Sequence, residues 1–309
     1  MTTMKAARIH EFGDFSVIRH DTVPLPRPAP GEVLVEVAAT SFNPTEAALR
    51  AGMLQGFLPV DLPHTLGWDV AGTVAGTGTG AQGFAVGDRV VGWLDSGAAA
   101  EYVRAPAAVL VPAPEAIPLA NAAALPLAGL TAWQAVFEHG KAAAGQRVLV
   151  NGAGGGTGGF VTQLAKYAGA EVLATAGARS AGAVRRQGAD QVIDYTAGPV
   201  AASLDGPVDL LLNLVPLSSR DAAALAPLVR PGGRVVSIAT PIEPPAGAEV
   251  TAMHMVARND PAQLGELVRL VEAGAVAIDI SGSRPLSDLA DVHRLSEAGL
   301  TRGKVVIIP

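Results

Sequence analysis

The fold of this chain is decided by the stretch RVLVNGAGGGTGG, residues 147–159. Residues 146–151 have the apolar, β-branched character of a strand, and a run of glycines follows at once. The apolar residues beyond the glycines recur at helical spacing, at Val161, Leu164, Ala165 and Ala168. A glycine-rich turn between a strand and a helix brings free backbone N–H groups and the helix dipole to one point, which suits a pyrophosphate. The stretch therefore predicts a dinucleotide-binding unit.

Two glycine spacings fit this prediction equally well. Gly154, Gly156 and Gly159 match G-x-G-x-x-G, whereas a second set matches G-x-x-G-x-x-G: Gly152, Gly155 and Gly158. A glycine-rich surface turn that holds no ligand is the alternative. The residues expected to contact the cofactor from this loop are Gly152, Gly154, Gly155, Gly156, Thr157 and Gly158.

Strand and helix signals alternate beyond the glycine run. We predict strands at residues 171–175, 191–194, 208–215 and 234–238, with alanine-rich helical stretches between them. Such βαβ units imply a parallel sheet that is covered by helices on both faces. Residues 119–274 are therefore expected to form a doubly wound Rossmann domain.

The two ends of the chain have a different pattern. Short strands are predicted at residues 4–9, 32–38, 70–75 and 89–93, without long helices between them, which indicates an antiparallel or barrel-like β domain. A helix begins at Pro261, and a final strand at 304–308 is expected to return to this first domain. The predicted fold class is α/β, with residues 1–118 and 275–309 forming a β-barrel-type domain beside the Rossmann domain.

Composition excludes several classes of function. The 309 residues have a formal net charge of −6, which argues against a nucleic-acid or anionic-membrane partner. Residues 116–136 are nearly uncharged, but prolines and polar residues interrupt them, so we expect a soluble protein without a membrane segment. No signal peptide is evident. The absence of cysteine excludes disulfides and thiolate metal sites and suits a reducing cytoplasm.

The end of the second strand of the Rossmann pattern predicts which dinucleotide is bound. NAD sites place an acidic residue there for the ribose hydroxyl, but residues 174–180 contain none, and Glu171 lies at the other end of the strand. Arg179 and Ser180 suit the 2′-phosphate of NADPH instead, with Ala176 beside them. Arg179 could equally be an exposed residue at a helix start, with Arg185 or Arg186 taking this role.

These motifs resemble the medium-chain dehydrogenase/reductase superfamily, specifically its zinc-free, zeta-crystallin-like quinone oxidoreductase branch. The resemblance extends over essentially the whole chain. It rests on AALPLAGLTAW at residues 123–133, the glycine loop with QLAK at 163–166, GADQVIDY at 188–195, RPGGR at 230–234 and TRGKVV at 301–306. The fold that it implies is a GroES-like β domain built from both chain ends, with a Rossmann domain between them. It also implies a homodimer.

The resemblance implies roles for further residues. Asn43 resembles an active-site asparagine near the nicotinamide, and Thr131 a threonine beside it; a turn residue and a helix-packing residue are the respective alternatives. Asp69 is expected to be a buried structural carboxylate and Lys304 a structural residue. The further cofactor contacts implied are Tyr195, Asn213, Ile238, Ala239, Met255 and Val256, and the apolar walls of the substrate pocket are Phe42, Met53, Leu54, Trp68 and Trp93. An apolar core would also explain those walls.

Zinc-dependent relatives carry a metal-ligating histidine where this chain has Trp68, between Gly67 and Asp69. No metal site is therefore predicted. Hydride transfer without a metal suits an acceptor whose reduction gives a delocalised anion, such as a quinone or an α,β-unsaturated carbonyl compound. We therefore expect an NADPH-dependent reductase of a small hydrophobic acceptor. One alternative is an enoyl-thioester reductase of lipid or polyketide metabolism, which uses the same chemistry. The other is a non-catalytic NADPH-binding redox sensor, which is possible because tyrosines common in relatives are missing from residues 45–54.

Overall fold

The computed structural model describes residues 2–309, which divide into two compact units. The first unit extends to Leu127 and also contains Asn259–Ala273 and Ile280–Pro309, and the second contains Ala128–Arg258 and Gly274–Asp279. The sequence predicted boundaries after residues 118 and 274. The observed boundaries differ because helices α2 (Leu119–Ala122) and α7 (Pro261–Glu272) pack on strands of the first unit.

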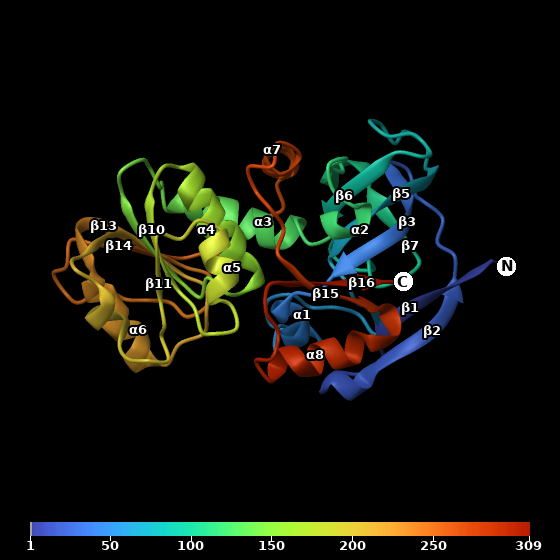
Figure 1. The fold of residues 1–309 in the computed structure, drawn as a ribbon. Helices are drawn as coiled ribbons and strands as arrows, with labels where there is room; N and C mark the ends of the chain where they lie inside the picture. The colour runs from blue at the N-terminus through green and yellow to red at the C-terminus, as the bar shows by residue number, and fades with distance from the viewer. Residues whose placement is uncertain (1) are drawn as a thin grey trace. The chain divides into compact units, whose positions relative to one another are not determined.

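A parallel sheet of six strands forms the centre of the second unit (Figure 1). Its strands are β9 (Arg147–Asn151), β10 (Glu171–Thr175), β11 (Gln191–Ile193), β12 (Val208–Asn213), β13 (Val229–Ser237) and β14 (Thr251–His254). They lie in the order β11-β10-β9-β12-β13-β14, and every neighbouring pair is parallel. The order reverses between β9 and β12, and ligands of open α/β sheets bind at the carboxyl ends of the strands at such a point. This is the predicted Rossmann architecture.

The helices of the second unit follow the strands. They are α4 (Gly156–Tyr167), α5 (Ala181–Arg186) and α6 (Ser219–Leu225), and α3 (Pro126–Trp133) leads into the unit and continues as a π-helical segment, Gln134–His139. In Figure 1, α4 and α5 lie together while α6 lies apart from them. The spacing that predicted α4 is explained by its buried face, which includes Val161, Leu164 and Ala165.

Antiparallel strands dominate the first unit. A three-stranded sheet joins β2 (Ile18–Pro24), β1 (Thr3–Ile9) and β4 (His64–Thr65). A seven-stranded sheet has the order β15-β16-β3-β5-β6-β8, with β7 also paired to β3. Its strands are β3 (Glu32–Ser41), β5 (Asp69–Thr77), β6 (Arg89–Trp93), β7 (Tyr102–Pro106), β8 (Leu110–Pro112), β15 (Ile280–Pro285) and β16 (Lys304–Ile308). The prediction that the last strand returns to this domain is confirmed, because β16 pairs with β3.

Two further helices complete the first unit. Helix α1 (Pro44–Arg50) follows β3, and α8 (Leu289–Glu297) packs against it. Between them lies a core that includes Phe42, Leu49 and Val292. Helix α1 therefore fixes the position of the chain just after β3, where Asn43 lies. Among residues 2–309, no helix is long and apolar enough to cross a membrane.

Candidate functional site

The glycine loop lies between β9 and α4, as predicted. Strand β9 ends at Asn151, and α4 begins at Gly156 with Gly155 as its N-cap. No side chain of residues 2–309 caps this helix, so its first backbone N–H groups and the positive end of its dipole are left for an anion. The loop follows the first strand of the Rossmann order, at the carboxyl edge of the sheet and beside the switch point. These features fit the pyrophosphate of a dinucleotide.

Close contacts show which positions of the glycine loop exclude a larger residue. A Cβ atom at Gly158 would lie 2.4 Å from the carbonyl oxygen of Gly152 and 2.6 Å from that of Ala153, so no larger residue fits there. At Gly159 the nearest atom is the flexible end of Gln187, at 2.8 Å. The tight packing of the helix on the turn therefore depends on Gly158. A Cβ atom at Gly155 would meet nothing closer than 3.7 Å, so these contacts select neither glycine spacing.

The end of β10 provides the second part of the candidate cofactor site. Ser180 lies against the loop, because a Cβ atom at Gly154 would lie 2.3 Å from its hydroxyl oxygen. Ala176 is buried at the strand end and Arg179 is exposed beside it. Tyr195 is 58% exposed, and its hydroxyl lies 3.5 Å from where a Cβ atom of Gly177 would stand. Tyr195 and Ser180 thus flank the same short turn, and the role of each in binding NADPH stays a prediction.

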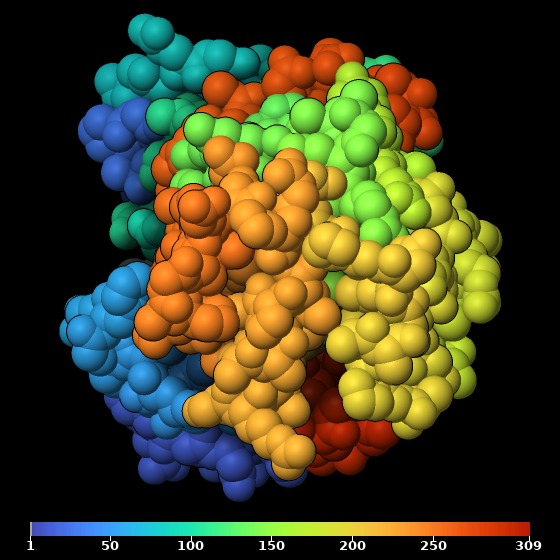
Figure 2. Space-filling model, turned by 90° about the vertical axis from the view of Figure 1, so that its left-hand side faces the viewer, coloured from blue at the N-terminus to red at the C-terminus, as the bar shows by residue number. Residues whose placement is uncertain are grey.

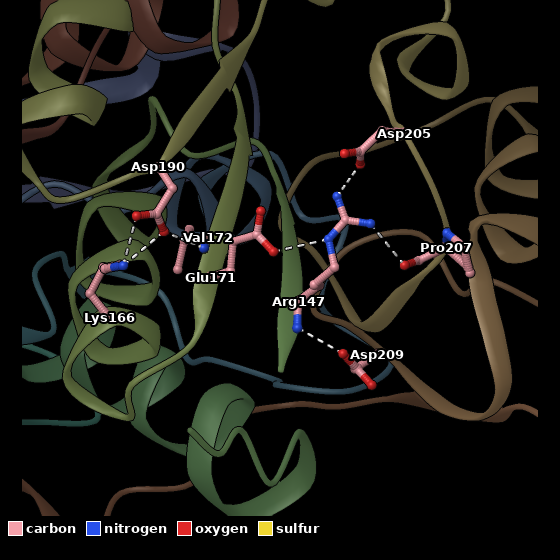
Figure 3. A network of polar contacts seen from close by, with 8 residues as sticks. All are labelled: Arg147, Lys166, Glu171, Val172, Asp190, Asp205, Pro207 and Asp209. Atoms are coloured by element: carbon pink, nitrogen blue, oxygen red, sulfur yellow. Dashed lines mark hydrogen bonds and ion pairs between the residues drawn. The ribbon is translucent and has the colours of Figure 1, made fainter. Parts of the chain in front are cut away.

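Glu171 lies at the opposite end of β10. Its carboxylate accepts a hydrogen bond of 3.0 Å from Nε of Arg147, at the amino edge of the parallel sheet (Figure 3). Neither it nor any other acidic residue between 171 and 180 reaches the carboxyl edge, where a ribose hydroxyl would need it. This placement agrees with the sequence-based preference for NADPH.

The later strands place the other predicted cofactor residues at their carboxyl ends. Asn213 ends β12 and is fully buried, with its amide bonded to Val215 and Ser237. Ile238 and Ala239 follow β13 and are half-buried. After β14, Met255 is buried while Val256 is 66% exposed. Of these residues, Asn213 is enclosed by protein on all sides, so its amide acts inside the sheet.

A buried polar cluster surrounds Asn43 in the first unit. The Asn43 amide oxygen accepts a 2.7 Å hydrogen bond from Nζ of Lys304, and its Nδ2 donates to Asp69 at 2.9 Å. Asp69 is 0% exposed and also accepts from the Ser41 hydroxyl at 2.5 Å and the Leu127 backbone N–H at 2.8 Å. The expected role of Asp69 as a buried structural carboxylate is seen directly, and Lys304 is the cation 3.6 Å from it.

Glu46 adds a second buried carboxylate to this cluster. It accepts hydrogen bonds from Nδ2 of Asn43 at 3.2 Å and from the Gly67 backbone N–H at 3.1 Å. Burial and the neighbouring Asp69 carboxylate together raise the pKa of Glu46 to about 8. Burial also lowers the pKa of Lys304, although Asp69 and Glu46 oppose that shift. The cluster contains one ammonium group, that of Lys304, and two carboxyl groups, those of Asp69 and Glu46. Its net charge is therefore zero when Glu46 holds a proton, as its raised pKa favours at neutral pH.

The two predicted catalytic residues are both buried. Asn43 is the N-cap residue of α1, and its amide hydrogens are directed at Asp69, Glu46 and the Ser41 carbonyl oxygen. To donate to the oxygen of a substrate, the Asn43 amide would have to break one of these hydrogen bonds. Thr131 lies in α3, 6% exposed. Their catalytic roles stay predictions.

The predicted pocket walls fall into two groups. Phe42 and Trp68 are buried in the core of the first unit, and Phe42 contacts the ring of His293 edge-on at 4.7 Å between centroids. Leu54 and Trp93 are partly buried against the same core. Met53 is 78% exposed on the turn after α1. Only the second group and Met53 have surface left for a ligand. Within residues 2–309, no group of three or more His, Cys, Asp or Glu side chains is arranged to hold a metal ion.

Two family models match this sequence, one in each half of the chain. Residues 29–115 match the alcohol dehydrogenase GroES-like domain, and residues 187–307 match a family described as zinc-binding dehydrogenase. The chloroplast envelope quinone oxidoreductase homolog of Arabidopsis thaliana is 33% identical over 99% of this chain and 98% of its own length. The chain belongs to the quinone oxidoreductase branch of the medium-chain dehydrogenase/reductase superfamily.

Two further relatives support membership of this superfamily. The NADPH-dependent alkenal/one oxidoreductase of Arabidopsis thaliana, a chloroplast protein, is 30% identical over 99% of this chain and 80% of its own length. The structure of Escherichia coli quinone oxidoreductase, solved in complex with NADPH, superposes with a TM-score of 0.88 at 25% identity, covering 99% of this chain and 100% of that one. The predicted GroES-like and Rossmann architecture of this superfamily is thereby confirmed.

Sequence reasoning missed several polar residues of this superfamily member. Asn151, Thr175 and Ser237 end three strands of the parallel sheet and are buried, and Glu46 lies inside the first unit. A usable signal existed for the first three, because each is a polar residue directly after an apolar run of a predicted strand. Glu46 had no such signal, since a glutamate in the first turn of a helix is ordinarily exposed.

Proposed function

We propose that this protein is an NADPH-dependent oxidoreductase that reduces a quinone or an α,β-unsaturated carbonyl compound. The observation that carries the proposal is the glycine loop at the switch point of the sheet, next to a strand end that offers Arg179 and Ser180 and no acidic residue. The names of the two Arabidopsis relatives support the same class of acceptor.

The second unit would hold the cofactor. The N–H groups at the start of α4 would bind the pyrophosphate, and Arg179 and Ser180 would bind the 2′-phosphate. When bound, NADPH supplies a hydride to the conjugated carbon or quinone ring of the acceptor. The acceptor oxygen then takes up a proton, which water supplies in our proposal, because residues 45–54 contain no tyrosine.

The first unit would hold the acceptor. Met53 and Leu54 leave apolar surface after α1, and Trp93 is partly buried, which favours a hydrophobic acceptor. Phe42 and Trp68 would support these residues from the core. A hydrogen-bond donor near the developing oxyanion, for which we propose Asn43, would stabilise the charge. For Thr131, which belongs to the second unit, we propose a place beside the nicotinamide of bound NADPH. Zinc ligands of metal-dependent relatives are replaced in this sequence, so the proposed hydride transfer uses no metal.

An assay of NADPH oxidation tests the proposed reaction. The purified protein is incubated with NADPH and with benzoquinones, naphthoquinones, 2-alkenals or enoyl-CoA thioesters in turn. We expect turnover of the first three classes, unchanged by EDTA. Turnover of thioesters alone would favour an enoyl-thioester reductase, and NADPH binding without any turnover would favour a redox sensor. Loss of activity with EDTA would contradict the metal-free reaction.

The cofactor preference is tested at Arg179. Arg179→Ala should raise the KM for NADPH about tenfold, because one charge-assisted phosphate contact is lost, and leave kcat and the KM for NADH unchanged. Arg19→Ala, an exposed arginine on β2, is the control. Equal KM values for NADPH in the Arg179 variant and the wild type would exclude Arg179, and the same substitution at Arg185 or Arg186 would then identify the phosphate ligand.

The assembly and location of the protein are also part of the proposal. Within residues 2–309, strand β14 pairs with β13 on one side only, and all four of its residues are exposed. In Figure 2, which faces the second unit, orange residues from the part of the chain that contains β14 lie at the surface. An exposed edge strand is a site for pairing with a second copy, which supports a homodimer. A cysteine-free chain supports a cytoplasmic location.

A further inference from the structure

A row of polar side chains crosses the carboxyl edge of the parallel sheet, behind the glycine loop. Thr175, Asn151, Asn213 and Ser237 end four neighbouring strands, β10, β9, β12 and β13. All four are buried, in a sheet whose other buried positions are almost entirely apolar. A buried polar side chain is costly unless it is hydrogen-bonded, so the partners of these four residues indicate what they do.

The four side chains form one continuous chain of hydrogen bonds. The Thr175 hydroxyl donates to Oδ1 of Asn151 at 2.9 Å, and Nδ2 of Asn151 donates to Oδ1 of Asn213 at 2.9 Å. Nδ2 of Asn213 then donates to the Ser237 hydroxyl at 3.0 Å, and that hydroxyl donates to the Thr240 carbonyl oxygen at 2.6 Å. Every donor thus points the same way along the row.

The glycine loop sets the donor-to-acceptor direction of these hydrogen bonds. The backbone N–H of Gly152 donates to the Thr175 hydroxyl oxygen at 2.8 Å. Because a backbone N–H is only a donor, the hydroxyl accepts there and turns its own hydrogen to Asn151. The orientation of the Asn151 amide follows, and then that of Asn213. Gly152, the first residue of the loop, therefore provides the first donor of this series of hydrogen bonds.

The same region of the loop supports α4. The N–H of Ala153 donates to the Thr175 carbonyl oxygen at 3.2 Å, so two bonds tie the loop start to the end of β10. Gly158, in the first turn of α4, packs directly on the carbonyl oxygens of Gly152 and Ala153. The position of this loop start thus sets the position of the helix N-terminus that would bind the pyrophosphate.

We propose that Thr175, Asn151 and Asn213 are positioning residues that hold the glycine loop in its cofactor-binding shape without contacting the cofactor. The inference rests on the proposed function, because NADPH is the ligand that the loop would bind. A loop that is ordered beforehand loses less conformational freedom on binding, so the hydrogen-bond chain should increase the affinity for NADPH. A chain that only stabilised the sheet would affect unfolding and leave the affinity unchanged.

Substitutions at Thr175 test the inference in the full-length protein. Thr175→Val keeps the side-chain shape and removes the hydroxyl, whereas Thr175→Ser keeps the hydroxyl. We expect Thr175→Val to raise the dissociation constant for NADPH about tenfold, since the Gly152 N–H and the Asn151 amide both lose a partner. We expect Thr175→Ser to stay within about twofold of the wild type. Binding is measured by NADPH fluorescence, and thermal unfolding is followed in parallel.

Hydrogen exchange provides a readout without cofactor. In Thr175→Val, the amides of residues 152–158 should exchange faster than in the wild type, while those of β12 and β13 should change less. Thr40→Val is the control, because Thr40 is buried with its hydroxyl unpartnered among residues 2–309. It should alter neither NADPH affinity nor exchange in the loop.

The outcomes separate this inference from the proposed function. A wild type that fails to bind NADPH would overturn the proposed function, whereas faster exchange of the loop in Thr175→Val would still show that the hydroxyl orders it. Equal NADPH affinity in the wild type and Thr175→Val, or equal weakening in Thr175→Ser, would overturn the positioning role. If Thr175→Val does not fold, Ser237→Ala replaces it, with about threefold weaker binding expected and Ser237→Thr as the rescue.

Discussion

Glu46 lies in the first turn of α1, yet its carboxylate is buried against Asn43 and Gly67. In the folded protein its pKa is raised by burial to about 8, compared with 4.5 for the unfolded chain. The folded state therefore binds this proton more tightly. The stabilising contribution is complete below pH 4.5 and is lost as the pH rises through 8.

This shift predicts a steep pH dependence of stability. Between pH 6 and pH 8, ionisation of Glu46 should lower the free energy of unfolding by ~1.4 kcal/mol per pH unit. Glu46→Gln should remove that slope, because glutamine has no proton to lose in this range. The NH2 group of the glutamine would face one of the two N–H groups that Glu46 now accepts from, so the urea midpoint at pH 6 should be lower than in the wild type. Urea unfolding at pH 6, 7, 8 and 9 measures both proteins. The same slope in the variant and the wild type would contradict the prediction.

His293 in α8 gives a dependence of the opposite sign. It is 0% exposed, both ring nitrogens are without a partner in residues 2–309, and it packs on Phe42. Burial and the charge of the buried Arg50 together lower its pKa to about 3. Arg50 itself pairs with Glu297. The unfolded chain binds a proton at this position near pH 6.5, so stability is lost as the pH falls from 6.5 towards 3.

We therefore expect His293→Leu to make the protein more resistant to acid. Leucine has a similar volume and cannot be protonated, so the fall in the urea midpoint from pH 6.5 to pH 4 should be smaller than in the wild type. His20→Gln, which changes an exposed histidine, is the control and should keep the wild-type fall. If the fall is equally steep in His293→Leu, another group is responsible.

At the scale of elements, a charged network ties the amino ends of several strands in the second unit (Figure 3). Arg147 at the start of β9 donates to Glu171 of β10 at 3.0 Å, to Asp205 at 2.5 Å and to the Pro207 carbonyl oxygen at 3.2 Å. Its backbone N–H donates to Asp209 of β12 at 2.7 Å. One guanidinium thus joins two strands and the segment that precedes β12.

Removal of this guanidinium should weaken the second unit. Arg147→Met keeps most of the side-chain length and should lower the free energy of unfolding by about 1 kcal/mol, because its partners are largely exposed. The difference from the wild type should shrink in 1 M NaCl. Arg294→Met, which breaks a single exposed pair with Asp291, is the control and should cost less. Urea unfolding at low and high salt checks both.

The sequence predicted the elements with strong patterns and missed those without them. Apolar runs such as Val148–Val150 identified the central strands of the second unit, because parallel strands are buried on both faces. Strand β2 was missed because only Ile18 in it is buried and its other residues carry no clear alternation. Helix α1 was missed because its seven residues are too few to show a helical period.

Of the candidate site, the sequence predicted only the part that is formed by one continuous segment. The glycine loop could be located from the sequence because its strand, its glycines and its helix follow one another within one short segment. The cluster around Asn43 could not, because Lys304 lies at the other end of the chain and only folding brings it to Asp69. The orientation of the Asn43 amide depends on these partners, so its hydrogen-bonding state could not be predicted from local sequence.

For the whole molecule, the proposed homodimer makes a direct prediction. The wild type should elute with about twice the 31.2 kDa of one chain in size-exclusion chromatography with light scattering. Met253→Asp places a charge on the exposed edge strand β14 and should produce monomers, because it disfavours pairing of two edges. Tyr167→Asp, at another exposed apolar residue of the second unit, should remain a dimer. A monomeric wild type would contradict the proposal.

Strand β16 gives the first unit an order of assembly during synthesis. At about 5–20 residues per second, a ribosome needs roughly ten to fifty seconds to proceed from Asp69 to Lys304. Throughout that interval the Asp69 carboxylate lacks the ammonium that lies 3.6 Å from it in the finished fold. The β domain that begins the chain is therefore completed last, after every strand of the Rossmann sheet has left the ribosome.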